Sequence, residues 1–300
     1  MNLVVGATGV LGGEICRLLT ERRNPVRALV RGTSHPDRVA HLKRLGAELV
    51  WGDLKDRRSL DVASRGASAV ISTASSTVSR QEGDSIESVD RQGQLDLIDA
   101  AAAAGVKRFV VVSFPSVAMD FPLQSAKRAV EERLRASGMT YTILRPTFFT
   151  EVWLSPALGF DAPNAKAQIY GDGQNRISWI SFQDVARFAV AALDNPKAKN
   201  AVIELGGPEA LSPLEVVRLA EQVTGKRFDV QHVPEEALQA QYGSATDPLQ
   251  QSFAALMLFY AHGAAIDMKG TLGAFPGQHL RSVRAYFETS TQTPSSVGPT

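Results

Sequence analysis

The feature that most constrains the fold is a glycine-rich turn between an apolar strand and an amphipathic helix at the start of the chain. The segment from Leu3 to Val5 is continuously apolar, as in a buried strand, and the apolar residues of 11–19 recur at helical spacing. Between them lies the turn Gly6-Ala7-Thr8-Gly9-Val10-Leu11-Gly12. A strand that passes through such a turn into a helix begins a βαβ unit, and this predicts an α/β fold.

The alternation of strand and helix continues over most of the chain. Further apolar runs predict strands at 26–30, 48–51, 69–72, 109–112, 140–144 and 202–204. Helical periodicity predicts helices at 37–45, 89–104, 125–137, 182–193 and 212–224. Near-continuous apolar strands are typical of a parallel sheet that is covered on both faces. We therefore predict a Rossmann-type, doubly wound parallel sheet.

The spacing of the glycines in the turn indicates a dinucleotide-binding site. Gly6 permits the tight turn, Gly9 lets the backbone approach a pyrophosphate, and Gly12 allows close packing of helix on strand. Free amides at the helix start would then face the phosphates, aided by the helix dipole. We expect the cofactor to be bound by Gly6, Thr8, Gly9, Val10, Leu11 and Gly12. The alternative is a flexible turn with no ligand.

The end of the second predicted strand indicates which dinucleotide is bound. A site selective for NAD usually carries Asp or Glu there to hold the ribose 2′-hydroxyl, whereas this chain has Arg31. A guanidinium binds a 2′-phosphate bidentately, so we predict NADP(H) rather than NAD(H). Thr33 and Ser34 could add further donors to the same phosphate. The alternative for Arg31 is a solvated charge at a strand end.

Three regions are expected along the chain. Residues 1–150 form the NADP-binding Rossmann domain. The alternation weakens after Thr147, so 151–288 is predicted to be a substrate-binding region, interwoven with returning Rossmann elements at about 178–206. From Thr289 onward Thr, Ser, Pro and Gly dominate, and 289–300 is predicted to be a disordered tail.

Composition excludes several other classes. The 32 Lys and Arg against 31 Asp and Glu leave a net charge of +1, so we expect no nucleic-acid partner. Five scattered histidines and a single cysteine, Cys16, favour neither a metal site nor a disulfide. No apolar stretch is long enough for a membrane span, and the weakly polar segment from Phe253 to Ile266 is predicted to be a buried helix. With no leader visible, we expect a cytoplasmic protein.

Further motifs lie at 26–31, Gly52-Asp53-Leu54, 104–109 and Leu144-Arg145-Pro146, with weaker ones at 184–186 and 266–268. Together with the glycine turn, they resemble the motifs of the NmrA-like family, an atypical branch of the short-chain dehydrogenase/reductase superfamily that includes isoflavone-reductase-like enzymes and small quinone reductases. The resemblance implies that Asp53 and Leu54 contact the adenine. It also implies that Ser72, Thr73 and Pro146 line the cofactor site.

The resemblance leaves the catalytic group in question. Members of the wider superfamily use a tyrosine four residues before a lysine, and here Leu123 stands four residues before Lys127. In reductases similar to isoflavone reductase a comparable lysine can act as proton donor, which makes Lys127 the candidate catalytic residue. Two alternatives remain for Lys127. It could only hold a ribose hydroxyl, or it could lie on a solvated helix face with Arg128 and Glu131.

Aromatic residues follow the predicted strand ends and recur in the later apolar helix. We predict that a substrate is contacted by Phe114, Phe148, Phe149, Trp153 and Tyr260. The alternative is that such residues are ordinary core. An apolar aromatic cavity would suit a flat electrophile, and the family resemblance implies a quinone, enone or aromatic carbonyl.

Three functions follow from these expectations. The first is an NADPH-dependent reductase of a flat apolar small molecule. The second is a non-catalytic NADP(H)-binding redox sensor, regulator or assembly factor of the NmrA type, because the superfamily tyrosine is missing. The third, nucleotide-sugar epimerase or dehydratase activity, normally requires the Tyr and Lys pair and ranks last.

Overall fold

The computed structural model describes residues 1–77 and 80–292, and these form two compact units. Unit 1 comprises Met1–Phe114, Pro122–Arg145 and Val185–Ile203. Unit 2 comprises Pro115–Phe121, Pro146–Asp184 and the chain from Glu204 onward. Each unit is therefore assembled from segments that are separated in the sequence.

Unit 1 is organised around a seven-stranded sheet with the order β3-β2-β1-β4-β5-β6-β9. Its strands are β1 (Asn2–Val5), β2 (Val26–Val30), β3 (Glu48–Trp51), β4 (Ala69–Ser72), β5 (Arg108–Val112), β6 (Thr140–Pro146) and β9 (Ala201–Leu205). The pairs from β3 across to β6 are all parallel. The order steps outward from β1 in both directions, which is the doubly wound topology. The predicted fold class is confirmed.

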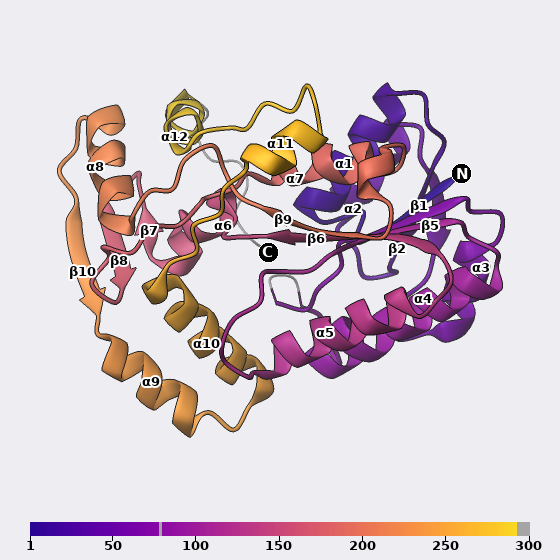
Figure 1. Ribbon diagram of the computed structural model, residues 1–300, viewed down its shortest axis with the longest axis horizontal. Helices are drawn as coiled ribbons and strands as arrows, with labels where there is room; N and C mark the ends of the chain where they lie inside the picture. The colour runs from indigo at the N-terminus through magenta and orange to yellow at the C-terminus, as the bar shows by residue number, and fades with distance from the viewer. Residues whose placement is uncertain (78–79, 293–300) are drawn as a thin grey trace. The chain divides into compact units, whose positions relative to one another are not determined.

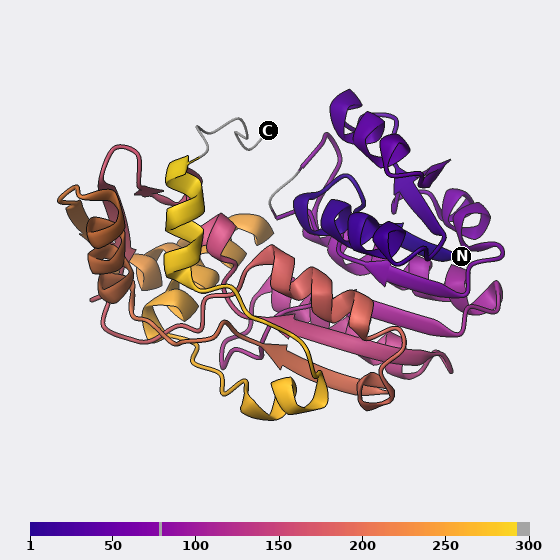
Figure 2. The ribbon, with the colours of Figure 1, turned by 90° about the horizontal axis from the view of Figure 1, so that it is seen from above.

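Helices cover both faces of this sheet. They are α1 (Val10–Glu21), α2 (Pro36–Arg44), α3 (Arg57–Ser64), the π-helix η1 (Ile86–Gln92), α4 (Gly93–Ala103), α5 (Pro122–Arg135), α7 (Phe182–Ala191) and the short η3 (Pro196–Ala198). α3, α4 and α5 lie on one face of the sheet, and α1 lies on the other (Figure 1). From above, the strands run beneath α1 and α7 (Figure 2). The sequence predicted each of the longer helices except α3.

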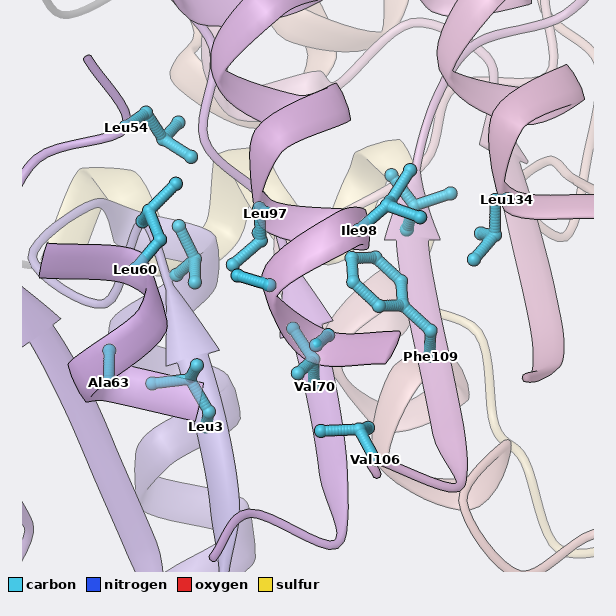
Figure 3. Packing of buried hydrophobic residues seen from close by; sticks show 14 of the residues in the cluster. Leu3, Leu54, Leu60, Ala63, Val70, Leu97, Ile98, Val106, Phe109 and Leu134 are labelled. Atoms are coloured by element: carbon cyan, nitrogen blue, oxygen red, sulfur yellow. The ribbon is translucent and has the colours of Figure 1, made fainter. Parts of the chain in front are cut away.

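The core of unit 1 lies between the sheet and the α3–α5 layer. Leu97 and Ile98 of α4 pack over Val70 and Phe109 of the sheet (Figure 3). All four side chains are fully buried. Burying a side chain of this kind stabilises a fold by about 1.5–3 kcal/mol relative to leaving it exposed. This packing fixes the carboxyl ends of the strands, from which the functional loops leave the sheet.

Unit 2 contains a small three-stranded sheet with the order β10-β8-β7. Its strands are β7 (Phe160–Asp161), β8 (Lys166–Tyr170) and β10 (Asp229–Val233). Its helices are α6 (Thr150–Trp153), η2 (Pro156–Leu158), α8 (Pro213–Thr224), α9 (Glu235–Ser244), α10 (Pro248–His262), α11 (Lys269–Ala274) and α12 (Val283–Gln292). The helix predicted within 253–266 is present as part of α10.

The end of the chain differs in part from the expectation of a tail from Thr289. α12 continues to Gln292, so the first four residues of the expected tail are helical. The remaining residues, 293–300, lie outside the described part of the chain. Among the described helices, none combines the length and hydropathy that crossing a lipid bilayer requires.

Candidate functional site

The glycine turn joins β1 to α1 through backbone that only glycine accommodates. Gly6 has φ +84°, and a Cβ there would lie 2.6 Å from Oγ1 of Thr73. A Cβ on Gly12 would overlap the carbonyl oxygen of Gly6, so α1 packs directly on the turn. The tight turn and the close helix-strand approach expected of Gly6 and Gly12 are therefore present.

Gly9 caps α1 and gives the helix start an open backbone. It forms no side-chain cap, and the first turn of α1 carries no acidic residue. Within the described chain, no protein acceptor is recorded for the amides of Val10, Leu11 and Gly12. The partial positive charge of the helix N-terminus adds to these free donors. The residues present therefore fit an anion such as a dinucleotide's diphosphate.

Arg38, which was not predicted from the sequence, forms a hydrogen bond to the glycine turn. It lies in the first turn of α2, and its Nη1 donates to the carbonyl oxygen of Thr8 at 2.9 Å. This contact turns one carbonyl of the loop toward a cation and leaves the loop amides free for a ligand. No spacing rule links position 38 to position 8, so the sequence alone offered no signal for it.

Arg31 lies at the end of β2, as expected, and belongs to a three-residue ion cluster. Its Nη1 lies 2.7 Å from Oδ2 of Asp84, and Nζ of Lys55 lies 2.6 Å from Oδ1. We call Arg31, Lys55 and Asp84 the Asp84 cluster. The side chain of Asp84 is 1% exposed, against 25% for Arg31 and 29% for Lys55. Arg31 is thus a partly buried, ion-paired residue rather than a solvated strand-end charge.

The pKa of Asp84 reflects this environment. Burial alone would raise it, but hydrogen bonds from Lys55 and Arg31 and one from the amide of Gln81 bring the pKa below the ordinary value for Asp. Asp84 is therefore a carboxylate at neutral pH. The cluster carries two positive charges and one negative charge.

The other predicted nucleotide contacts occupy different environments. Thr73 packs against Gly6 and donates from Oγ1 to the carbonyl of Val5 at 3.2 Å. Ser72 is 1% exposed, and its hydroxyl donates to Oε1 of Gln94 at 2.8 Å. Asp53 accepts from the amide of Lys55 at 2.9 Å, which closes the turn after β3. Leu54 is buried in the core of unit 1, and Pro146, the last residue of β6, belongs to unit 2.

Lys127 lies in α5 and forms a buried ion pair with Asp90 of the π-helix η1. The distance from Nζ to Oδ1 is 3.0 Å, and the two side chains are 9% and 0% exposed. The alternative of a solvated helix face for Lys127 is therefore wrong. A π-helix is uncommon and is often found at functional sites. Asp90 was not predicted as a site residue, because a single aspartate within the predicted helix 89–104 carries no motif.

Asp90 is held as a carboxylate by its surroundings. Burial would raise its pKa, yet the charge of Lys127 and hydrogen bonds from Ser75 and Ser76 lower the pKa below its usual value. The amide and hydroxyl of Ser76 donate to Oδ2 at 3.0 and 2.6 Å. The ionised carboxylate of Asp90 therefore faces the side-chain nitrogen of Lys127 directly.

Ser113, which directly follows β5, forms a hydrogen bond within unit 1. Oγ of Ser113 donates to Oε1 of Glu131 at 2.8 Å. Glu131 is buried and also pairs with Arg128, Arg135 and Arg145. This network holds α5 against the ends of β5 and β6. Glu131 does not lie on a solvated face.

The predicted substrate-contacting aromatics divide between the units. In unit 2, Phe148, Trp153 and Tyr260 form one cluster, with ring centroids 4.8 Å apart for Phe148 and Trp153 and 5.4 Å apart for Trp153 and Tyr260. Phe148 and Tyr260 are each 3% exposed, and burial raises the pKa of Tyr260. Phe149 packs on Phe182 instead, at 4.3 Å.

Phe114 is the one predicted aromatic in unit 1, where the guanidinium of Arg128 lies 5.4 Å from its ring centroid. The unit 2 cluster is largely core-like. Of its members, Trp153 retains partial exposure.

Comparison with known proteins agrees with this architecture. The NmrA-like family model matches residues 2–274. An NAD(P)H azoreductase from Xenophilus azovorans is 32% identical over 295 residues, covering 96% of each chain. The photosystem II assembly factor Ycf39 of Trieres chinensis is 32% identical over 239 residues, which are 77% of this chain and 72% of that protein.

A solved structure shares the fold over nearly the whole chain. The NADPH-dependent quinone oxidoreductase of Escherichia coli, in complex with NADPH, matches with a TM-score of 0.77 at 23% identity, covering 96% of this chain and 99% of the other. Since the family model spans most of the sequence and the relatives match at this identity, the chain belongs to the NmrA-like family.

Proposed function

We propose that the protein is an NADPH-dependent reductase of a flat apolar electrophile, such as a quinone, an enone or an aromatic carbonyl. The observation that carries the proposal is the glycine turn, where Gly9 opens the backbone and the first amides of α1 are free. The activities of two similar proteins support the proposal: one is an NAD(P)H azoreductase, and the other is a quinone oxidoreductase with NADPH bound. Azo compounds and quinones are both flat electron acceptors.

In this proposal the turn holds the diphosphate and Arg31 recognises the 2′-phosphate, so that NADP(H) is preferred over NAD(H). The amides of Val10, Leu11 and Gly12 supply the donors to the diphosphate. Arg31 keeps donors beyond the one that faces Asp84, since a guanidinium carries five N–H groups. The bound dinucleotide would supply a hydride to the acceptor.

Lys127 is the proposed source of the proton that accompanies this hydride. Reduction of a carbonyl or quinone adds a hydride and leaves negative charge on oxygen, which a proton from Nζ would neutralise. Asp90 holds Nζ in position, with Oδ1 at 3.0 Å. The alternative role, holding a ribose hydroxyl, uses the same ammonium without losing its proton.

The second function is a non-catalytic NADP(H)-binding sensor or assembly factor. It is supported by the identity to the photosystem II assembly factor Ycf39 and by Leu123 at the position of the superfamily tyrosine. In that case the nucleotide would bind at the same turn and act by shifting the protein between conformations.

One experiment separates the two functions. NADPH oxidation is followed by loss of its absorbance with a panel of quinones, enones and an azo dye, alongside calorimetric titration of NADPH and NADP⁺. Turnover with any acceptor supports the reductase. Binding of NADPH without oxidation of any acceptor, with strong discrimination between the two redox forms, supports the sensor and contradicts the reductase.

A further inference from the structure

Both oxygens of the Asp84 carboxylate are paired with cations: one with Arg31, the proposed 2′-phosphate contact, and one with its neighbour Lys55. Oδ2 faces Arg31 and Oδ1 faces Lys55, at 2.7 and 2.6 Å. Oδ2 also accepts from the amide of Gln81 at 3.0 Å. The Asp84 side chain is 1% exposed and its partners Arg31 and Lys55 are 25% and 29% exposed, so solvent screens these contacts only in part.

The segment that carries Asp84 is docked on the loops after β2 and β3. Nε2 of Gln81 donates to the carbonyl of Thr33 at 3.1 Å, and the hydroxyl of Thr33 bonds to the Gln81 side chain. Nζ of Lys55 also reaches the carbonyl of Glu82 at 3.3 Å. Residues 81–84 therefore place an anion where Arg31 and Lys55 converge.

The charges decide between the anions that could occupy this position. A phosphate monoester carries about −1.5 to −2 at neutral pH and offers three acceptor oxygens, whereas Asp84 carries one negative charge and offers two oxygens. Arginine and lysine side chains together favour the more highly charged anion. A 2′-phosphate that reaches the Asp84 cluster must therefore compete with the Asp84 carboxylate for Nη1 of Arg31 and Nζ of Lys55.

We propose that Asp84 is an internal anion that competes with the 2′-phosphate of NADP(H) for Arg31 and Lys55. Asp84 thereby limits how strongly the site prefers NADP(H) over NAD(H). This inference rests on the proposed function, because it requires that the nucleotide binds at this turn. NAD(H) lacks the 2′-phosphate and leaves the two ion pairs intact, so the competition should lower the affinity for NADP(H) only.

The test is the affinity of the full chain for NADPH and NADH, each titrated by calorimetry into the wild type and into Asp84→Asn. Removing the competing charge should tighten NADPH binding by about tenfold and leave NADH within about twofold. Asp61→Asn is the matched control: it removes one carboxylate from α3, where Asp61 is 43% exposed and pairs with Arg57. That control should leave both affinities unchanged.

Three results would overturn the inference. Weaker NADPH binding in Asp84→Asn would show that the carboxylate positions the cations rather than competing for them. Weaker NADH binding would show that Asp84 accepts a ribose hydroxyl. Unchanged affinities would show that Asp84 is remote from the phosphate. If the wild type binds neither nucleotide, the proposed function itself fails.

A second variant covers the case in which Asp84→Asn does not fold, which its circular dichroism melting curve would show. Gln81→Ala keeps the carboxylate but removes the side-chain contacts to Thr33 that hold the segment in place. It should tighten NADPH binding by about threefold with NADH unchanged. Equal or weaker NADPH binding in this variant would count against the proposal.

Discussion

At the scale of single residues, the proposed nucleotide binding depends on the absence of Cβ atoms at the glycines of the turn. A Cβ on Gly9 would contact only the carbonyl of Gly6, at 3.2 Å, so Gly9→Ala should fold. We expect it to weaken NADPH and NADH binding alike, by about tenfold or more, because the methyl group separates the backbone from the diphosphate.

Gly13→Ala is the matched control for this prediction, because its Cβ would lie at an ordinary 3.5 Å from the carbonyl of Ala7. Calorimetric titration of both variants checks the comparison. Equal nucleotide affinities in Gly9→Ala and Gly13→Ala would show that the turn does not bind the nucleotide.

Arg31 provides the second prediction at this scale. Arg31→Gln removes a charge-assisted contact to the 2′-phosphate, and such contacts contribute about 1.5–3 kcal/mol. NADPH binding should therefore weaken by about tenfold to a hundredfold, and NADH binding should change little.

Arg91→Gln is the control for Arg31→Gln, since Arg91 is 50% exposed and pairs only with Glu87 among the described residues. Fluorescence titration of the reduced nucleotides measures both variants. If Arg31→Gln lost NADPH and NADH binding to the same extent, the specificity assigned to Arg31 would be wrong.

At the scale of elements, η1 and α5 are joined by the buried pair of Asp90 and Lys127. Lys127→Met leaves Asp90 buried without its cation, and breaking a buried pair in this way typically costs about 3–5 kcal/mol. The double variant Asp90→Asn/Lys127→Met removes both charges and should be more stable than Lys127→Met alone. Denaturant unfolding of the three proteins measures this. A single variant as stable as the wild type would contradict the ion pair.

The same pair predicts a dependence of stability on pH. The pKa of Asp90 is lowered on folding, so the stability that it contributes is present above its unfolded pKa and is lost as the pH falls through the folded value. Asp84 and Glu131 have lowered pKa values too and act in the same direction. We therefore expect acid unfolding, and a smaller loss of stability on acidification in Asp90→Asn than in the wild type. Equal losses would show that Asp90 is not held ionised.

The proposed chemistry of α5 has its own test. Lys127→Arg keeps a cation opposite Asp90, but a guanidinium does not give up its proton at ordinary pH. We expect NADPH binding to be retained and NADPH oxidation to fall by about a hundredfold or more, within the usual contribution of general acid catalysis. Retained turnover would show that Lys127 holds the nucleotide without donating a proton.

The elements could be predicted from the sequence where the local signals were strong. Every strand of the large sheet overlaps a predominantly apolar run, and α1 follows a turn whose geometry requires glycine at 6 and 12. α3 was missed because it is only eight residues long, about two turns, which is too short for an apolar repeat to recur along the sequence. The π-helix η1 was missed because no residue pattern distinguishes it from the α-helix that continues from it.

At the scale of the whole molecule, what the sequence could not supply is pairing between distant residues. Arg31 and Lys127 were predicted without the carboxylates that pair with them, whereas the structure gives each a buried carboxylate from the segment before α4. Asp84 and Asp90 carry no motif of their own, and only the folded chain brings them to these cations. The predicted substrate aromatics Phe148 and Tyr260 are buried in the core of unit 2, a position that an apolar pattern along the chain also allows.

The most direct test of the central claim is calorimetric titration of the folded protein with NADPH and with NADH. We expect both nucleotides to bind at one site and NADPH to bind more tightly, because the turn holds the diphosphate of each and Arg31 recognises only the 2′-phosphate. Absence of heat with both nucleotides, under conditions in which the protein is folded by circular dichroism, would contradict it.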